Sequence, residues 1–262
     1  MEMVGKRISD RSVLRLLRKW IQVGFIDDGR FFVSETGTGQ GQTISPLLAN
    51  VYLHHVLDEW FEQVVKPRLR GEAHEIRFAD DAVICFQYRE DAEKVMDVLP
   101  KRFAKYGLTL HPEKTRLLEF GRCAMGKEKW QGRKPDAFAF LGFTHICAQS
   151  RKGRFTVHVK TMSKRLRRGL NEIAQWCQAH RHEPVDQQQK TLNAKLRGHN
   201  QYYGRPTNYR GILKFYRGVQ HIWHRWLSRR IRGGPISWEK YNAILRRHPL
   251  LSPRIMHAWV KR

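Results

Sequence analysis

Two adjacent aspartates, Asp80 and Asp81, lie inside a run of residues that favour β-structure. The run reads IRFADDAVIC over residues 76–85, and Ala-Asp-Asp interrupts its apolar residues. This pattern predicts two strands joined by a tight turn that presents both carboxylates. Carboxylate pairs on such a turn suit Mg²⁺, a hard cation that takes oxygen ligands and keeps substrate phosphates in its shell. The predicted chemistry is therefore nucleotidyl transfer, and the alternative is an ordinary exposed Asp-Asp turn.

The positive charge of the chain is concentrated in its second half. Lys and Arg number 49 against 24 Asp and Glu, which gives a net charge of +25. Residues 1–121 hold 18 basic and 18 acidic residues, and residues 122–262 hold the other 31 basic and 6 acidic residues. The second half also holds six of the eight Trp and five of the eight Tyr, so it can build a core. A folded, basic and aromatic-rich part favours a nucleic-acid partner over a membrane surface.

The cysteines and histidines give little support for a zinc site. The four cysteines lie far apart and form no C-x-x-C pair: Cys85, Cys123, Cys147 and Cys177. With no secretion signal at the start of the sequence and no apolar run of about 18 residues, this usage predicts a reduced, cytoplasmic setting without a membrane span. His221 and His224 can share a helix face, but no Cys or acidic residue stands at ligand spacing beside them.

The apolar periodicity predicts an α+β first part that passes to an all-helical second part near residue 160. Helices are expected over 10–23, 45–67, 90–106, 161–180, 186–202, 208–231 and 236–247. Strands are expected near 31–33 and 115–120, in hairpins over 76–85 and 137–147, and over 154–159. Ser9 and Asp10 are candidate caps of the first helix. The inward face of that helix is predicted to consist of Val13, Leu14, Leu16, Leu17, Trp20 and Ile21.

A glycine-rich loop over residues 34–43 precedes the helix that Ser45 and Pro46 open. The loop contains three glycines, which let backbone approach a ligand closely: Gly37, Gly39 and Gly41. The side-chain amide of Gln40 can read a base or a template backbone. The alternative is an ordinary glycine loop that feeds a helix.

The order of these motifs resembles that of the reverse transcriptase/maturase proteins encoded by group II introns. The matching segments are GTGQGQTISPLLAN (37–50), FADD (78–81), HPEKT (111–115), FLGF (140–143) and LNAKLRGHNQYYG (192–204). Gly39 replaces the usual Pro of the family and Gln42 replaces a Gly, which implies a freer loop. The resemblance implies a partial right-hand polymerase palm over 1–160, followed by an all-helical thumb and maturase RNA-binding domain over 161–262.

The resemblance also implies a role for each motif in RNA-directed DNA polymerisation at a two-Mg²⁺ site. Asp80 is then a strong metal ligand and Asp81 a weaker one. Lys114 is expected near the incoming deoxynucleoside triphosphate (dNTP), where it can protonate the leaving group. The residues expected to bind template and primer are Gln40, Gly41, Phe78, Ala79, Phe140, Leu141 and Gly142. The alternatives are a core position for Phe78, a solvated side chain for Lys114 and a plain core hairpin for residues 140–143.

In this family a further metal-binding Asp lies on a strand upstream of the helix expected at 10–23. The residues before that helix, MEMVGKRIS, contain no Asp and fit no strand, and Asp10 fits a capping role. The chain is therefore expected to be a C-terminal portion with an incomplete metal site and little or no polymerase activity alone. The alternatives are a non-enzymatic RNA-binding remnant and one half of a split reverse transcriptase, whose partner fragment supplies the missing part.

The second half is expected to bind intron RNA in support of splicing. Its cations form two clusters: Lys164, Arg165, Arg167 and Arg168, and Arg225, Arg229 and Arg230. Such clusters give salt-dependent phosphate affinity, and neighbouring aromatic rings can stack on unpaired bases. Core positions are expected instead for Trp176, Trp223 and Trp226. The implied partners are group II intron RNA, an RNA template, a DNA primer and a dNTP, in a bacterial or organellar nucleoprotein.

Overall fold

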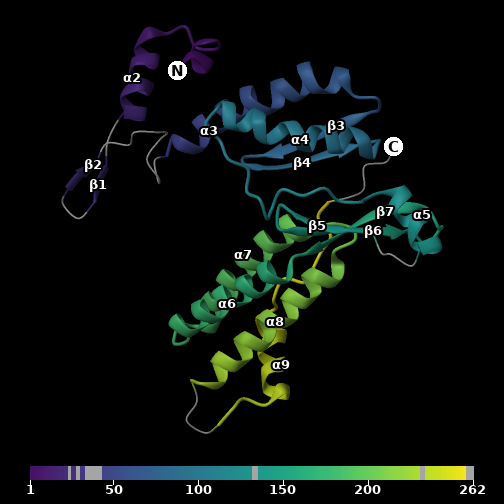
Figure 1. Cartoon of the computed structure of the whole chain (residues 1–262). Coiled ribbons are helices and arrows are strands. Elements are labelled where there is room, and N and C mark those ends of the chain that lie inside the picture. Colours follow the sequence, from purple (N-terminus) through teal and green to yellow (C-terminus); the bar gives the residue numbers. More distant parts are fainter. Residues whose placement is uncertain (23–24, 28–29, 33–42, 132–134, 231–233, 258–262) are drawn as a thin grey trace. The chain divides into compact units, whose positions relative to one another are not determined.

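The computed structural model describes residues 1–22, 25–27, 30–32, 43–131, 135–230 and 234–257 (Figure 1). The chain divides into two compact units, Met1–Leu117 and Leu118–Arg262. Glu119 is the only charged residue among 118–121, so the first unit holds 18 basic and 17 acidic residues and the second 31 and 7. The charge excess therefore belongs to the second unit. Among the described residues, no helix is long and apolar enough to cross a membrane.

The first unit begins with helices α1 (Glu2–Gly5) and α2 (Arg11–Gln22). Asp10 caps α2 as predicted, because its Oδ1 accepts hydrogen bonds from the backbone N–H groups of Ser12 at 2.7 Å and Val13 at 3.1 Å. The two bonds satisfy donors that the first turn of a helix leaves without a partner.

The prediction that six apolar residues of α2 are buried on its inward face is largely wrong. Only Leu17 is buried, and three of the six predicted residues are 40–46% exposed: Val13, Leu16 and Trp20. An amphipathic pattern shows what a helix is able to bury, but it does not place the covering surface in the same unit. The described residues of the first unit cover this helix only around Leu17.

Two short strands follow, β1 (Phe25–Asp27) and β2 (Arg30–Phe32), paired antiparallel with Phe25 opposite Phe32. The strand predicted near 31–33 corresponds to β2, whereas β1 was not predicted because three residues are too few to display a period. Most of the predicted glycine-rich loop, residues 34–42, lies outside the described residues.

A continuous helical segment then runs from Ser45 to Arg68, as the Ser45-Pro46 signal predicts. It comprises α3 (Ser45–Leu53), the π-helical turns η1 (His54–Asp58) and η2 (Phe61–Val65), and the 3₁₀ turn η3 (Lys66–Arg68). Inserted π turns are frequent next to functional sites, because they change the direction of side chains along a helix.

The predicted Asp-Asp hairpin is confirmed as β3 (Ala73–Phe78) and β4 (Asp81–Phe86). The strands pair antiparallel from Ala73 opposite Phe86 to Phe78 opposite Asp81. Helix α4 (Arg89–Lys105) follows close to its predicted range. One core cluster joins the helices to the hairpin: Phe61, Val65, Ala73 and Val95. The hairpin is therefore held by packing on one face.

The strand predicted at 115–120 is wrong, because these residues have no regular structure. The backbone N–H of Glu119 donates to Asp136 Oδ2 at 2.9 Å, and the N–H of Asp136 donates to the carbonyl of Glu119 at 3.1 Å. These bonds take the place of a strand ladder where the chain passes from one unit to the other. Helix α5 (Arg122–Gln131), which was not predicted, follows.

The second unit begins with an antiparallel sheet in the order β5-β6-β7. Its strands are β5 (Ala137–Phe140), β6 (Phe143–Gln149) and β7 (Phe155–Thr161), which confirm the predicted hairpin and the predicted third strand. Thr161 N–H donates to Asn208 Oδ1 at 2.9 Å, and Val159 N–H to Thr207 Oγ1 at 2.9 Å. This sheet therefore belongs with the helices, and the predicted boundary at 160 marks only the change from strands to helices.

The helices of the second unit are α6 (Ser163–Ala179), α7 (Val185–Tyr203), α8 (Tyr209–Ser228) and α9 (Trp238–Arg247), all close to their predicted ranges (Figure 1). Trp223 is fully buried, and its indole N–H donates to the buried Gln188 at 2.9 Å. Trp226 is buried as predicted and Trp176 packs against the same core. This aromatic core makes the basic unit a folded domain rather than a tail.

Candidate active-site hairpin and nucleic-acid surface

The candidate catalytic carboxylates lie at the tip of the β3–β4 hairpin. Phe78 pairs with Asp81 across the strands, so Ala79 and Asp80 form a two-residue turn. Asp80 and Asp81 are both exposed. Within the described part of the chain, neither carboxylate has a hydrogen-bond or ion-pair partner. Their oxygens are therefore available to a hard cation.

The hairpin has one covered face and one open face. Ala73 is buried and Arg77 is half-buried on the covered face, whereas Ile76 is 53% and Phe78 64% exposed on the other. The core position considered for Phe78 is therefore wrong. An exposed aromatic ring next to two unpaired carboxylates suits contact with a bound nucleotide.

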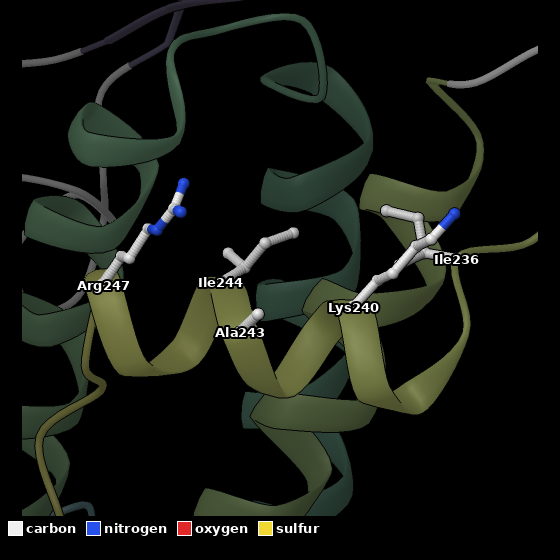
Figure 2. Close-up of a pocket in the computed structure, with 5 residues that line it drawn as sticks. All are labelled: Ile236, Lys240, Ala243, Ile244 and Arg247. Atoms are coloured by element: carbon white, nitrogen blue, oxygen red, sulfur yellow. The ribbon is translucent and has the colours of Figure 1, made fainter.

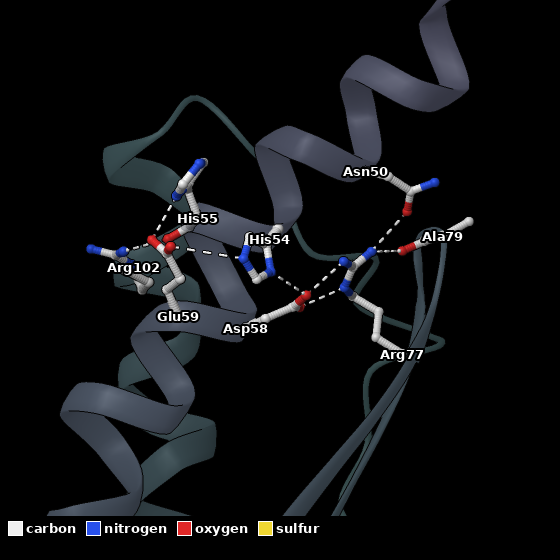
Figure 3. A network of polar contacts seen from close by, with 8 residues as sticks. All are labelled: Asn50, His54, His55, Asp58, Glu59, Arg77, Ala79 and Arg102. Atoms are coloured by element: carbon white, nitrogen blue, oxygen red, sulfur yellow. Dashed lines mark hydrogen bonds and ion pairs between the residues drawn. The ribbon is translucent and has the colours of Figure 1, made fainter. Parts of the chain in front are cut away.

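Arg77 connects the turn to the long helical segment (Figure 3). Its Nε donates to Asp58 Oδ1 at 2.6 Å and its Nη2 to Asp58 Oδ2 at 2.7 Å. Its Nη1 donates to Asn50 Oδ1 at 3.0 Å and to the carbonyl of Ala79 at 2.8 Å. Sequence reasoning missed this residue, although an arginine between Ile76 and Phe78, on the face opposite to theirs, was a detectable signal.

Asp58 is held in its charged form by its neighbours. Burial pushes the pKa of Asp58 upward, but hydrogen bonds from Arg77 and His54 outweigh it and lower the pKa below its ordinary value. His54 Nδ1 lies 3.1 Å from Asp58 Oδ2. The ion pair between Asp58 and Arg77 is thus present at neutral pH.

Glu75 is a half-buried acid of β3 whose environment disfavours its charged form. One of its carboxyl oxygens is buried without a hydrogen-bond partner. Burial first, and then the negative charges of Asp58 and Glu62, raise the pKa of Glu75 to about 7, although Arg77 opposes the shift. Folding of the hairpin therefore shifts Glu75 toward its protonated form.

We predict that Glu75→Gln removes a pH-dependent loss of stability from the hairpin. The folded pKa of about 7 lies above the ordinary glutamate pKa of 4.5, so the stability of the hairpin falls as the pH rises through this window and stays low above it. For a half-buried group the loss is about 1–2 kcal/mol after solvent screening. Hydrogen exchange of residues 73–86 at pH 5 and pH 8, corrected for intrinsic rates, measures it. Glu72→Gln, at an exposed neighbour, is the control, and an unchanged pH difference in Glu75→Gln contradicts the prediction.

Lys114 is exposed, and its backbone N–H donates to the carbonyl of His111 at 3.2 Å, so the HPEKT motif forms a tight turn. It belongs to the same unit as the Asp-Asp turn. Its role at the incoming triphosphate stays a prediction. Gln40 and Gly41, predicted to contact the template, lie outside the described residues.

The predicted primer-gripping residues Phe140, Leu141 and Gly142 lie in the second unit, at the β5–β6 turn. Leu141 has φ 47° and Gly142 φ 77°, and Tyr202 Oη donates to the Leu141 carbonyl at 2.9 Å. A Cβ at position 142 would meet the hydroxyl of Tyr203 at 3.2 Å. The close backbone approach predicted at Gly142 is thus made by α7 of this chain, and contact with a primer stays a prediction.

The predicted RNA-binding cations are exposed on α6 and at the end of α8. The exposed residues are Lys164, Arg165, Arg167, Arg168, Arg225, Arg229 and Arg230. Arg168 pairs with Glu172 at 2.9 Å, and Arg229 lies over the Trp226 ring at 4.6 Å. Arg230 donates to the carbonyl of Glu183 at 3.0 Å. In the described structure the other four cations have no hydrogen-bond or ion-pair partner, so their charges are available to phosphates.

Several aromatic side chains of the second unit are also exposed. Tyr202, Tyr209 and Trp238 are each 47–49% exposed. His224 stacks on Trp238 at 4.2 Å between ring centroids, and its Nε2 lies 2.7 Å from the carbonyl of Ile236. The part of the chain that the structure covers holds no group of three or more metal-ligating side chains.

A shallow hollow of about 300 Å³ lies along α9 (Figure 2). Its floor is apolar and two exposed cations flank it: Ile236, Ala243 and Ile244, with Lys240 and Arg247. It holds no carboxylate or nucleophile, so it adds to the basic surface rather than to any catalytic site.

The donor set at the hairpin tip fits part of a magnesium site. Asp80 and Asp81 supply oxygen ligands without internal partners, as Mg²⁺ requires. A two-metal site for in-line phosphoryl transfer needs further ligands. Over the described ranges, no third acid joins these two in a metal-binding group.

Comparison with known families matches residues 6–145 to the family described as reverse transcriptase (RNA-dependent DNA polymerase). The match covers more than half of the chain and includes the hairpin with both aspartates. The chain therefore belongs to the reverse transcriptase family.

The resemblance to group II intron proteins is also confirmed. The chain is 25% identical to the group II intron-encoded protein LtrA of Lactococcus lactis over 133 residues, 47% of this chain and 22% of that protein. It is 37% identical to an uncharacterized 91 kDa protein in the cob intron of Schizosaccharomyces pombe over 62 residues, 24% of this chain and 8% of that protein. It is 40% identical to protein YkfC of Escherichia coli over 79 residues, 30% of this chain and 19% of that protein. The matches span less than a quarter of each of these proteins.

Proposed function

We propose that this chain is the part of an RNA-directed DNA polymerase that carries the Asp-Asp turn, joined to a domain that binds intron RNA. The observation that carries the proposal is the two-residue turn before Asp81, with two exposed, unpartnered carboxylates, in a member of the reverse transcriptase family. The substrates follow from that family: an RNA template, a DNA primer and a dNTP.

The residues divide the work of nucleotidyl transfer between them. Asp80 and Asp81 would hold Mg²⁺, with Asp80 the stronger ligand. Bound Mg²⁺ supplies positive charge that stabilises the reacting phosphate. Lys114 protonates the pyrophosphate as it leaves, and the exposed Phe78 supports the primer end next to the carboxylates.

The maturase role rests on the second unit. Its net charge is about +24 from 31 basic and 7 acidic residues, and four of its exposed cations have no hydrogen-bond or ion-pair partner in the described structure. Lys164, Arg165 and Arg167 share the first turns of α6, which presents a dense positive patch to a phosphate backbone. The RNA partner we propose is a group II intron.

We predict that the chain alone does not extend a primer on an RNA template with Mg²⁺. Two carboxylates on one turn do not complete the ligand set of a two-metal site. Coexpression with an N-terminal fragment of a related group II intron-encoded protein should give extension that requires both the added fragment and Asp80.

Primer extension by purified protein measures this, with the fragment alone as control. Robust primer extension by the lone chain contradicts the prediction that its metal site is incomplete. If the two fragments form a stable complex that never extends a primer, the polymerase proposal is wrong and the RNA-binding remnant takes its place.

A further inference from the structure

The geometry points to Arg77 as a positioning residue that fixes the Asp80–Asp81 turn in the orientation that metal binding requires. The inference rests on the proposed function, because it gives the two carboxylates their role. Arg77 itself would touch neither metal nor substrate.

Arg77 uses its whole guanidinium group. Two parallel N–H groups grip both oxygens of Asp58 at 2.6 and 2.7 Å, and the remaining nitrogen donates to Asn50 and to the Ala79 carbonyl. The Arg77 side chain is 12% exposed, so these bonds are largely shielded from water. Such a fork is available only to arginine, since the lysine ammonium is a point charge with no fixed plane.

The turn needs support at this point. Ala79 has φ 53°, a left-handed conformation that costs a residue with a side chain about 1–2 kcal/mol. The Ala79 carbonyl belongs to the same peptide plane as the backbone nitrogen of Asp80. The bond from Arg77 at 2.8 Å therefore fixes the plane from which Asp80 projects.

The residues that hold Arg77 on its other side lie on the long helical segment, Ser45 to Arg68. Asn50 is in α3 and Asp58 ends the π turn η1, and Figure 3 shows both side chains directed at the Arg77 guanidinium. Both residues belong to the segment LLANVYLHHVLDEW, residues 47–60. Contact with a template, which was predicted for Gln40 and Gly41, does not explain a polar side chain at position 50 or 58. Their placement gives this motif a second role, which is to hold the catalytic turn through Arg77.

The test compares Arg77→Lys with Arg102→Lys in the full chain. Arg102 is a matched control because it donates to the carbonyls of Val56 and His55, in the same helical segment, without contact to the turn. One readout is amide exchange of Ala79 to Asp81 by NMR. The other is the Mn²⁺ concentration that broadens the Asp80 and Asp81 signals, since Mn²⁺ binds oxygen ligands like those of Mg²⁺.

We expect Arg77→Lys to speed exchange in the turn about tenfold and to weaken Mn²⁺ binding about tenfold, from the loss of one charge-assisted hydrogen bond. Arg102→Lys should change each by less than about twofold. Exchanging the charges in Asp58→Arg/Arg77→Asp should restore thermal stability but not Mn²⁺ affinity, because an aspartate cannot donate to the Ala79 carbonyl.

If Mn²⁺ affinity and turn exchange in Arg77→Lys follow Arg102→Lys, or if the charge exchange restores affinity together with stability, Arg77 is only structural and the inference is wrong. A different outcome is that Mn²⁺ fails to broaden the Asp80 and Asp81 signals of the unaltered chain while amide exchange in the turn still depends on Arg77. In that case the proposed role of the two carboxylates as metal ligands is wrong. The two proposals thus fail through different measurements.

Discussion

Asp80→Asn is expected to reduce RNA-templated primer extension by about 10³-fold or more in the complemented protein, because an amide cannot supply the charge that a metal ligand provides. Asp80 projects from a two-residue turn, exposed and without a partner among the described residues, so the change breaks no internal contact. Single-turnover extension rates measure the loss without interference from product release.

The control for this loss is Asp97→Asn, the same chemical change at an exposed site on α4 of the same unit. It should leave extension within about twofold of the unaltered protein. Asp81→Asn should cost less than Asp80→Asn, because Asp81 is the weaker ligand of the proposed metal site. A variant Asp80→Asn that keeps a tenth or more of the rate contradicts the assignment of Asp80.

The parts of the fold that could be predicted are those whose signal is local. The Asp10 cap, the Ser45-Pro46 helix start and the hairpin around Ala79 are each specified by a few adjacent residues, and the structure confirms all three. The four helices of the basic unit were predictable for a different reason, since each is long enough to display its period.

The errors occurred where structure depends on distant partners. Residues 115–120 contain the β-favouring pattern of a strand, but Glu119 bonds to Asp136 instead of to a neighbouring strand. Val13 and Trp20 have the spacing of a core face, yet they are exposed because the described first unit does not cover them. Periodicity reports the chemistry of a face and not the identity of its partner.

The candidate site shows the same division. The exposed Asp-Asp turn and the exposed cation clusters could be predicted from residue type and order, and their roles stay predictions. The bridge from Arg77 to Asp58, 19 residues apart, could not, because only the fold brings them together. Because of this contact, Arg77 in β3 and the helical segment that starts at Ser45 together support the Asp80–Asp81 turn.

Binding of RNA by the second unit is expected to depend steeply on salt. With roughly 6–10 phosphate contacts, affinity should fall by about 10³-fold or more between 50 and 200 mM salt, because each contact releases condensed counterions. The triple variant Lys164→Gln/Arg165→Gln/Arg167→Gln removes three exposed cations from the first turns of α6. The variant loses about three phosphate contacts, so the slope of its log affinity against log salt should be shallower. The ratio of its affinities at 50 and 200 mM salt should therefore be about 20- to 40-fold smaller than that of the unaltered protein.

Filter binding or fluorescence anisotropy with intron RNA across the salt series gives both slopes. The matched control is Lys94→Gln/Lys101→Gln/Lys105→Gln, which removes the same charge from exposed positions on α4 of the first unit. The first unit holds 18 basic and 17 acidic residues, so its net charge offers a polyanion little attraction. If the control variant lowers the slope as much as the α6 variant does, the basic surface of the second unit is not the RNA-binding site, and non-specific net charge accounts for the affinity instead.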